Sequence, residues 1–331
     1  MTQEQFATAA SADAAGYPPA SERTESATAS ANPLFSFSGH PGGVAVGADD
    51  SIWVSDTVSA TVWRLAGDGI ATSVLSPRAE PREGAITASG PRSAAGLALG
   101  PDGSLFIADS TGNRVWSIGH DGSARVVAGG ASGYRDGPGT KALFRQPLDV
   151  AIAADGLCYV ADTGNDRIRR IERDGSVSTV AGSIYDYGDG RGAGARFRRP
   201  GALDVDASGI CYVADTGNNA IRRIAPDGTV TTLAGGPPGG DSDGTGTGIG
   251  LRWPTGIAVG EDGAVWVADY GNGALRCISS AGESHSSLRL TGLRWPVAVA
   301  LRADGTPVVA GAASYDVHAP EACLMSVTEA Q

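Results

Sequence analysis

Short apolar runs separated by Gly-rich turns recur along this chain at nearly constant spacing. The eight residues 158–165 recur unchanged at 211–218, and weaker copies of the apolar part occur in four other places. The residues that close these runs are Asp56, Asp109, Asp162, Asp215, Asp269 and Gly311, with steps of 53, 53, 53, 54 and 42 residues. The spacing predicts six structural repeats between about residue 40 and the end of the chain.

Each repeat has the pattern of four short strands. An alternating apolar run leads to an Asp-Gly turn such as Asp102-Gly103, and a second run leads to the turn 162–165 or its equivalent. A third and a fourth run follow, joined by another Asp-Gly turn. Strands of this length joined by tight turns predict an antiparallel meander in each repeat and an all-β chain. Because one such sheet cannot bury both of its faces, we expect six sheets to stack around an axis.

The sixth repeat lacks a run for a fourth strand. Its third strand is expected at 324–327, and the stretch 32–38 before the first repeat has a strand pattern without a repeat of its own. We therefore expect this N-terminal strand to complete the last sheet and close the ring. Residues 1–30, rich in Ala, Ser, Thr and Glu, have the composition of a disordered tail. The expected domain is a single one over 31–331.

Composition narrows the class of protein. The 49 Gly are explained by turns that need positive φ, and the net charge of −11 argues against a general nucleic-acid binder. The sequence predicts no membrane span and no secretory signal. The four Cys form no Cys-x-x-Cys pair, which favours a reducing compartment, and we expect a cytoplasmic protein.

The repeat resembles the NHL-repeat family. A Pro stands fifteen residues before the residue that closes the second run, except in the second repeat, which has Ala94; we call it the entry Pro. The shared elements are this entry Pro with alternating Val, the Asp-Gly turn, Val-Ala-Asp-(Thr/Tyr)-Gly-Asn and Ile-Arg-Arg-Ile, and they extend over most of the chain. The resemblance implies a six-bladed β-propeller, and protein-interaction scaffolding is the commonest role it implies. Enzymatic six-bladed relatives bind calcium through axial carboxylate and amide groups, or zinc through several His. Only four His are present, so the sequence does not favour zinc, and no cofactor is predicted beyond a divalent cation such as calcium.

Candidate ligand-binding residues lie beside the entry Pro of each repeat. Strand alternation places the connections between repeats and the 162–165 type of turn on one face, and loops on a rigid scaffold commonly bind ligands. The residue two positions before the entry Pro is an arginine in five of the six repeats. The candidates here are Arg145, Arg198, Arg252 and Arg294, with the adjacent Trp253 and Trp295 and with His40 in the first repeat. These arginines either pair with the repeated aspartates or bind a carboxylate or phosphate ligand.

Two carboxylates break the repeat on the innermost strand. Asp149 and Asp204 replace Gly or Ala at positions that line the predicted axis. A charge there needs a partner, so each either pairs with a neighbouring Arg, binds a cation or acts in catalysis. The repeated aspartates themselves are expected to cap the turn that follows them.

The sixth repeat adds candidate acid–base groups. Its connection after residue 310 is about seven residues longer than the equivalents and contains Tyr315 and His318. These are either catalytic groups or part of an ordinary variable loop. The leading hypothesis is a stand-alone propeller that binds a small anionic ligand on its loop-rich face, and in its wider form transforms the ligand by lyase or hydrolase chemistry. The alternative is a protein-interaction scaffold without catalytic activity.

Overall fold

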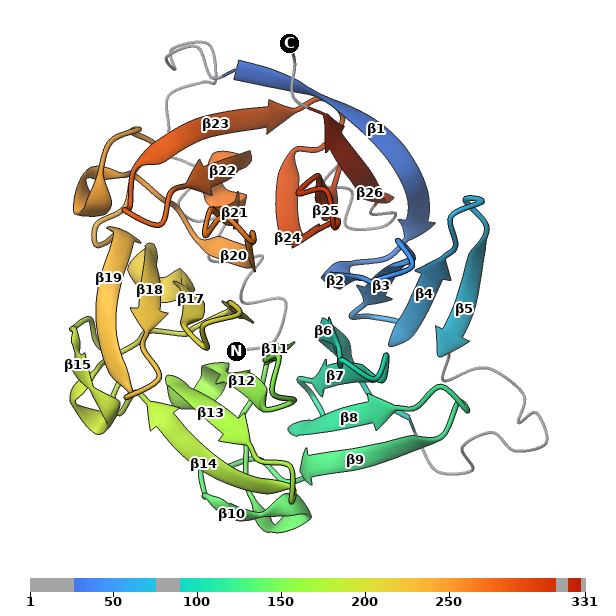
Figure 1. Ribbon diagram of the computed structural model, residues 1–331, viewed down its shortest axis with the longest axis vertical. Helices are drawn as coiled ribbons and strands as arrows, with labels where there is room; N and C mark the ends of the chain where they lie inside the picture. The colour runs from blue at the N-terminus through green and yellow to red at the C-terminus, as the bar shows by residue number, and fades with distance from the viewer. Residues whose placement is uncertain (1–26, 76–89, 314–320, 329–331) are drawn as a thin grey trace.

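The computed structural model describes residues 27–75, 90–313 and 321–328. They form six blades of β-strands around a central axis, as the sequence predicted (Figure 1). Blade 1 consists of β2 (Pro41–Val46), β3 (Ile52–Asp56), β4 (Thr61–Leu65) and β5 (Ala71–Leu75). Blade 2 consists of β6 (Ala94–Leu99), β7 (Leu105–Asp109), β8 (Arg114–Ile118) and β9 (Ala124–Gly129). The first strand of each blade lies nearest the axis.

Blades 3 and 4 each gain a short fifth strand at the outer edge. Blade 3 consists of β11 (Asp149–Ile152), β12 (Cys158–Asp162), β13 (Arg167–Ile171), β14 (Ser176–Ala181) and β10 (Gly137–Pro138). Blade 4 consists of β16 (Ala202–Val205), β17 (Cys211–Asp215), β18 (Ala220–Ile224), β19 (Thr229–Gly235) and β15 (Gly190–Arg191). Strands β10 and β15 belong to the connections that enter these blades, so each connection folds back along the outer strand of the blade it enters.

The N-terminal strand closes the ring. Blade 5 consists of β20 (Pro254–Val259), β21 (Val265–Asp269), β22 (Ala274–Ile278) and β23 (Ser284–Leu290). Blade 6 consists of β24 (Trp295–Leu301), β25 (Pro307–Ala312), β26 (Glu321–Thr328) and β1 (Ala27–Ser38). Residues 30–38 of β1 pair antiparallel with β26, which confirms the expected closure. The strand starts earlier than expected, because residues 27–29 also pair in parallel with β23 of blade 5.

The core lies between neighbouring blades. The middle residue of each second strand is fully buried: Val54, Ile107, Val160, Val213, Val267 and Val309. One apolar cluster joins Ala161 and Ile168 of blade 3 to Leu203 and Val213 of blade 4, and similar clusters join other neighbours. Burial of a large apolar side chain contributes about 1.5–3 kcal/mol, so the ring is stabilised by contacts that each blade can make only with the next.

Regular helix is limited to short 3-10 turns in the described residues. None of the helices there has the length and apolar character needed to cross a membrane. No disulfide joins the four cysteines, all of which lie in the described residues.

Candidate functional site

One face of the ring carries the connections between blades and the turns between second and third strands, and we call it the loop face. In blades 3, 4 and 5 these turns are the 3-10 helices η4 (Thr163–Asn165), η6 (Thr216–Asn218) and η8 (Tyr270–Asn272). The hydroxyl of Thr163 donates to the carbonyl of Pro200 in the next blade at 2.6 Å, and Thr216 bonds Pro254 in the same way. The turns therefore also hold neighbouring blades together.

The repeated aspartate organises this face from inside. Asp162 is fully buried; its Oδ1 accepts the backbone N–H of Arg145 at 2.8 Å, and its Oδ2 accepts the side-chain amide of Asn165 at 2.9 Å. Asp215 and Asp269 make the equivalent bonds. The expected backbone cap of the following turn is found in blades 1 and 2, where Asp56 accepts the N–H of Val58 and Asp109 that of Gly112. In blades 3 to 5 the Asn side chain takes that place.

A buried arginine from the third strand completes the network in blades 3 to 5. Arg169 Nη1 donates to Asp162 Oδ2 at 2.7 Å, and the same guanidinium contacts Asp136 and the carbonyls of Arg135 and Leu143 in the incoming connection. Arg222 and Arg276 repeat this arrangement with Asp189 and Asp243. Burial raises the pKa of Asp215 and of Asp269 to about 6, although the arginines oppose the shift. Each of these arginines fastens one interblade connection to its blade.

The ionic partners of the repeated aspartates in blades 3 to 5 are these third-strand arginines. The entry arginines Arg145, Arg198 and Arg252 bind the same aspartates through their backbone N–H groups, whereas the N–H of Arg294 donates to the carbonyl of Ala312. Arg145, Arg198 and Arg294 are exposed, as is His40, whereas Arg252, Trp253 and Trp295 are partly buried. Arg294 lies over the ring of Trp295, with 4.9 Å from Cζ to the centroid. In the described residues the guanidiniums of Arg145 and Arg198 form no ion pair with Asp162 or Asp215, which pair with Arg169 and Arg222, so the expected pairing is wrong for these two arginines.

The glycine in each turn of blades 3 to 5 makes room for an entry arginine. A Cβ added to Gly164, Gly217 or Gly271 would lie 2.6, 2.6 and 2.4 Å from the Cγ of Arg145, Arg198 and Arg252, respectively. The aliphatic part of each arginine thus lies directly against its own turn. The repeated glycine positions these arginine side chains on the loop face.

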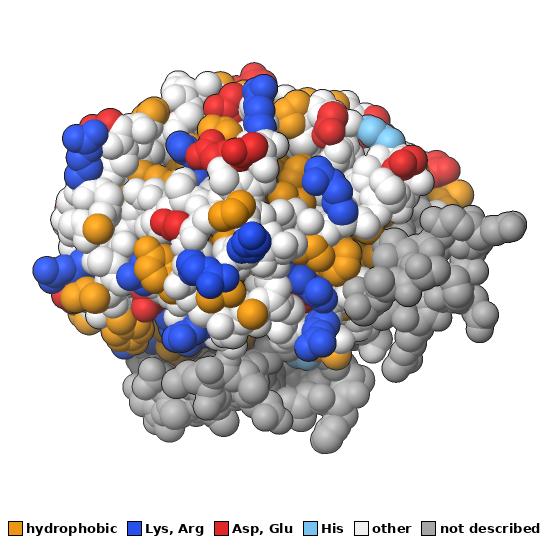
Figure 2. All heavy atoms as spheres, turned by 90° about the horizontal axis from the view of Figure 1, so that it is seen from below, with side chains coloured by type: hydrophobic (Ala, Val, Ile, Leu, Met, Phe, Trp, Pro, Cys, Tyr) orange, Lys and Arg blue, Asp and Glu red, His pale blue; other side chains and the backbone are white. Residues whose placement is uncertain are grey.

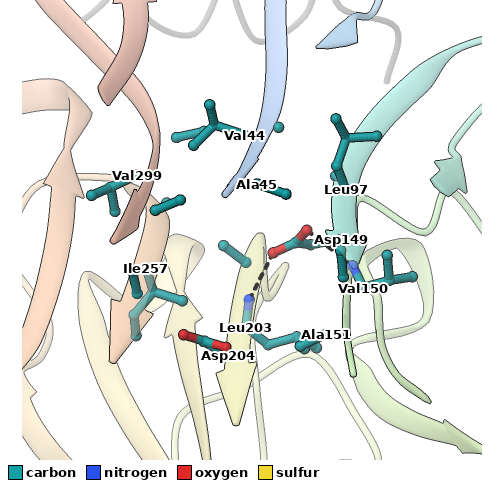
Figure 3. Close-up of a pocket in the computed structure, with 18 of the residues that line it drawn as sticks. Val44, Ala45, Leu97, Asp149, Val150, Ala151, Leu203, Asp204, Ile257 and Val299 are labelled. Atoms are coloured by element: carbon teal, nitrogen blue, oxygen red, sulfur yellow. Dashed lines mark hydrogen bonds between the residues drawn. The ribbon is translucent and has the colours of Figure 1, made fainter. Parts of the chain in front are cut away.

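The six innermost strands enclose a cavity of about 250 Å³ on the axis (Figure 3). Its lining is almost entirely Gly, Ala, Val, Leu and Ile, and Asp149 and Asp204 bring the carboxylates. Asp149 accepts the N–H groups of Val150 and of Leu203 in the next blade at 2.9 and 3.0 Å. Asp204 accepts those of Val205 and of Val259 in the next blade, both at 2.8 Å. Each carboxylate therefore links two adjacent innermost strands.

No arginine faces these two carboxylates among the described residues, so the expected ion pair is absent there. Burial raises the pKa of Asp149 to about 8 and that of Asp204 to about 6, and the accepted N–H groups limit both shifts. The negative charge of Asp204 also raises the pKa of Asp149. The N–H dipoles present their positive ends to the carboxylate oxygens, an arrangement that does not favour a cation. The described residues contain no cluster of three or more His, Cys, Asp or Glu side chains suited to a metal.

Tyr315 and His318 lie outside the described residues, so their proposed acid–base roles stay predictions. Sequence reasoning missed the buried Arg169, Arg222 and Arg276, although all three stand in the repeated third strand. It also passed over Ile184, which is 58% exposed beside Tyr185 at 53%. Comparison of repeats could have found this pair, because Ala131 and Ser132 occupy the same positions one repeat earlier.

Comparison with known proteins agrees with the repeat. The model of the NHL repeat matches residues 251–278. Protein SUPPRESSOR OF QUENCHING 1, chloroplastic, of Arabidopsis thaliana is 34% identical over 142 residues, which covers 39% of this chain and 14% of that protein. NHL repeat-containing protein 2 of Bos taurus is 31% identical over 153 residues, or 39% of this chain and 20% of that protein. The resemblance to NHL-repeat proteins is confirmed, and this chain spans a fifth or less of these two relatives.

Solved structures show the same fold at low identity. The gluconolactonase XC5397 of Xanthomonas campestris aligns with a TM-score of 0.63 and 15% identity, over 89% of each chain. At this identity the likeness concerns the six-bladed architecture alone.

Proposed function

We propose that this NHL-repeat propeller is a binding module whose loop face takes a carboxylate-bearing segment of a partner protein. The observation that supports this best is the set of exposed arginines at equivalent positions of blades 3, 4 and 6, whose guanidiniums form no ion pair with a repeated aspartate in the described residues. Arg145, Arg198 and Arg294 would make the main contacts, and the partly buried Arg252 would add to them. Arginine suits this role because its planar donors bind carboxylates in a bidentate way. Trp253, Trp295 and His40 would flank the contacts.

The size of the axial cavity and the bonding of its two carboxylates favour a protein segment over a small molecule. Pockets for drug-sized ligands commonly measure about 300–1,000 Å³ and place a few convergent polar groups around the ligand. This cavity is smaller, and its two carboxylates accept backbone N–H groups of the strands that line it. Exposed aromatic and aliphatic side chains lie on the loop face instead, at Tyr134, Ile184 and Tyr185. Such side chains are typical of protein interfaces.

A small anionic ligand is the second candidate, and the pKa of about 8 of Asp149 favours it. A carboxyl group that exchanges its proton near neutral pH can act as a general acid or base. In this version Asp149 and Asp204 would serve lyase or hydrolase chemistry at the axis, together with Tyr315 and His318, and a divalent cation such as calcium would assist them. A cytoplasmic location is proposed for either version.

Fluorescence polarisation with labelled 12-residue peptides tests the proposal. We expect a Glu/Asp-rich peptide to bind, and the peptide with Gln and Asn in the same places to bind about tenfold more weakly or worse. The triple variant R145A/R198A/R294A should lose the acidic peptide. A matched control, R64A/R173A/R302A, removes the same charge from the opposite face and should bind normally.

Small carboxylates provide the opposing test. Citrate and succinate at millimolar concentration should leave the Tm of the protein unchanged, since the proposal assigns them no site. If they raise the Tm while the acidic peptide fails to bind, the small-ligand candidate is correct. If neither ligand has an effect, both candidates are wrong.

A further inference from the structure

Two adjacent apolar residues are exposed on the connection that enters blade 4. Ile184 and Tyr185 have 58% and 53% of their surface exposed. In the connection that enters blade 3 the same positions hold Ala131 and Ser132, one repeat of 53 residues earlier. The backbone role is the same in both, because Ser132 pairs with Phe144 and Tyr185 pairs with Phe197 in equivalent parallel bridges. The fold therefore does not require large apolar side chains here.

The other exposed tyrosine of this face has a structural explanation. The hydroxyl of Tyr134 bonds the hydroxyl of Thr179 at 3.0 Å, and its ring lies over Arg169. Tyr187 occupies the equivalent place in blade 4, bonded to Thr232 and lying over Arg222. This pair belongs to the repeat, whereas Tyr185 is an addition to it.

Tyr185 contacts one of the candidate ligand-binding arginines. The Arg198 guanidinium lies over the Tyr185 ring, with 4.5 Å from Cζ to the centroid, and Arg198 Nε donates to the tyrosine hydroxyl. Gly217 holds the aliphatic part of Arg198 from the other side. In the described part of the chain no hydrogen bond involves Nη1 or Nη2 of Arg198, so the end of the guanidinium is held in place with its donors available. Arg145, the equivalent in blade 3, contacts no aromatic ring there.

We propose that Ile184, Tyr185 and Arg198 form the main contact for a linear partner segment in which an aliphatic side chain neighbours a carboxylate. The aliphatic side chain would pack on Ile184 and the Tyr185 ring, and the carboxylate would accept from Arg198. The neighbouring Asp186 is paired with Arg196 at 2.7 Å, which balances its charge beside the incoming carboxylate. Tyr and Arg are the residue types that contribute most at protein interfaces. This inference rests on the proposed function and assigns its specificity.

Two labelled peptides test the inference with the intact protein. The first is Gly-Glu-Leu-Asp-Leu-Glu-Gly, and the second has Ser in place of both Leu. Wild type should bind the Leu peptide about tenfold more tightly than the Ser peptide, and the double variant I184S/Y185S should bind the two alike. Y185F, which keeps the ring and loses the hydroxyl contact to Arg198, should retain most of the Leu preference. R198A should weaken both peptides.

The matched control is I70S, which removes an equally exposed isoleucine (60% exposed) from the turn between β4 and β5 on the opposite face. It should keep the full preference for Leu. If wild type binds both acidic peptides equally, or I184S/Y185S keeps the preference, the inference is wrong while the proposed function stands. If wild type binds neither peptide, the proposed function fails and this inference fails with it.

Discussion

Blades 3 to 5 and blades 6, 1 and 2 place opposite chemistry at the same buried position of the third strand. In blades 3 to 5, which we call the arginine half, the residue that pairs with the fully buried apolar residue of the second strand is Arg169, Arg222 or Arg276. In the other half it is Met325, Trp63 or Trp116. The arginines fasten the incoming connections through hydrogen bonds and ion pairs. Met325 and Trp63 fill the position by packing, and Trp116 also donates from Nε1 to Asp109 Oδ2 at 3.3 Å.

The connections that enter blades 3, 4 and 5 are also held by a side chain of the preceding blade. Asn113, Asp166 and Asn219 adopt positive φ after their turns, and each accepts the N–H of the residue before the next entry Pro at 2.8–2.9 Å. Ala60 and Gly273 hold this position in blades 1 and 5 and have no side-chain acceptor. The arginine half therefore presents fixed connections on the loop face, and the exposed Ile184, Tyr185 and Arg198 lie on one of them. Figure 2 views a flank of the ring, where basic side chains alternate with acidic and apolar ones instead of forming one large patch.

The largest effect should come from the half that is closed by β1. Deletion of residues 1–38 removes Leu34, Phe35 and Phe37 from the apolar cluster of blades 6 and 1 and exposes the edge of β26. We expect a loss of about 5 kcal/mol or more in the free energy of unfolding, because three large side chains are lost together with a strand. Urea unfolding measures this. A variant that melts like the full chain would show that β1 does not close the ring.

In the arginine half, R222M introduces the methionine that blade 6 has at the equivalent position. It should lower the free energy of unfolding by about 3–5 kcal/mol, since Asp215 is left buried without its ionic partner. The double variant D215N/R222M should recover part of this loss. Thermal unfolding of both variants checks the expectation. Equal stability of R222M and wild type would mean that methionine and arginine stabilise this buried position equally well. The difference between the two halves would then have no effect on stability.

A smaller, pH-dependent effect should come from the axial carboxylates of blades 3 and 4. The pKa of Asp149 is raised from 3.8 to about 8 in the folded protein, so its stabilising contribution is present at low pH and is lost as the pH rises toward 8. D149A, which installs the residue of blade 4 at this position, should therefore be less stable than wild type at pH 4–5 and should approach it near pH 9. For D204A the same change should be complete near pH 7, because the raised pKa is about 6. Chemical unfolding at several pH values tests this; parallel curves for wild type and D149A would contradict it.

The fold was predictable because the repeat recurs at nearly equal steps and each repeat contains its own turns. The closing strand was predictable because the last repeat lacked one and residues 32–38 had no repeat of their own. Its extension to Ala27 was not, since pairing with β23 depends on where blade 5 lies in space.

The site was predictable in part. In blades 3 to 5 the repeat has arginines both before the entry Pro and in the third strand, and spacing alone cannot tell which guanidinium reaches the repeated aspartate. The third-strand arginine does, and the entry arginine gives its backbone N–H. In the same way, Asp149 and Asp204 were identified as unusual, but their partners are backbone N–H groups of the next blade, which leave no pattern in the sequence.

Hydrogen exchange with the Leu-containing acidic peptide tests the central claim most directly, because it compares the two halves of the ring in one experiment. Backbone amides of residues 183–198 should exchange more slowly when the peptide is bound, and those of β2–β5 and β24–β26 should be unchanged. The protection should disappear in R198A. Protection confined to blades 6 and 1, or none on the loop face, would contradict the account.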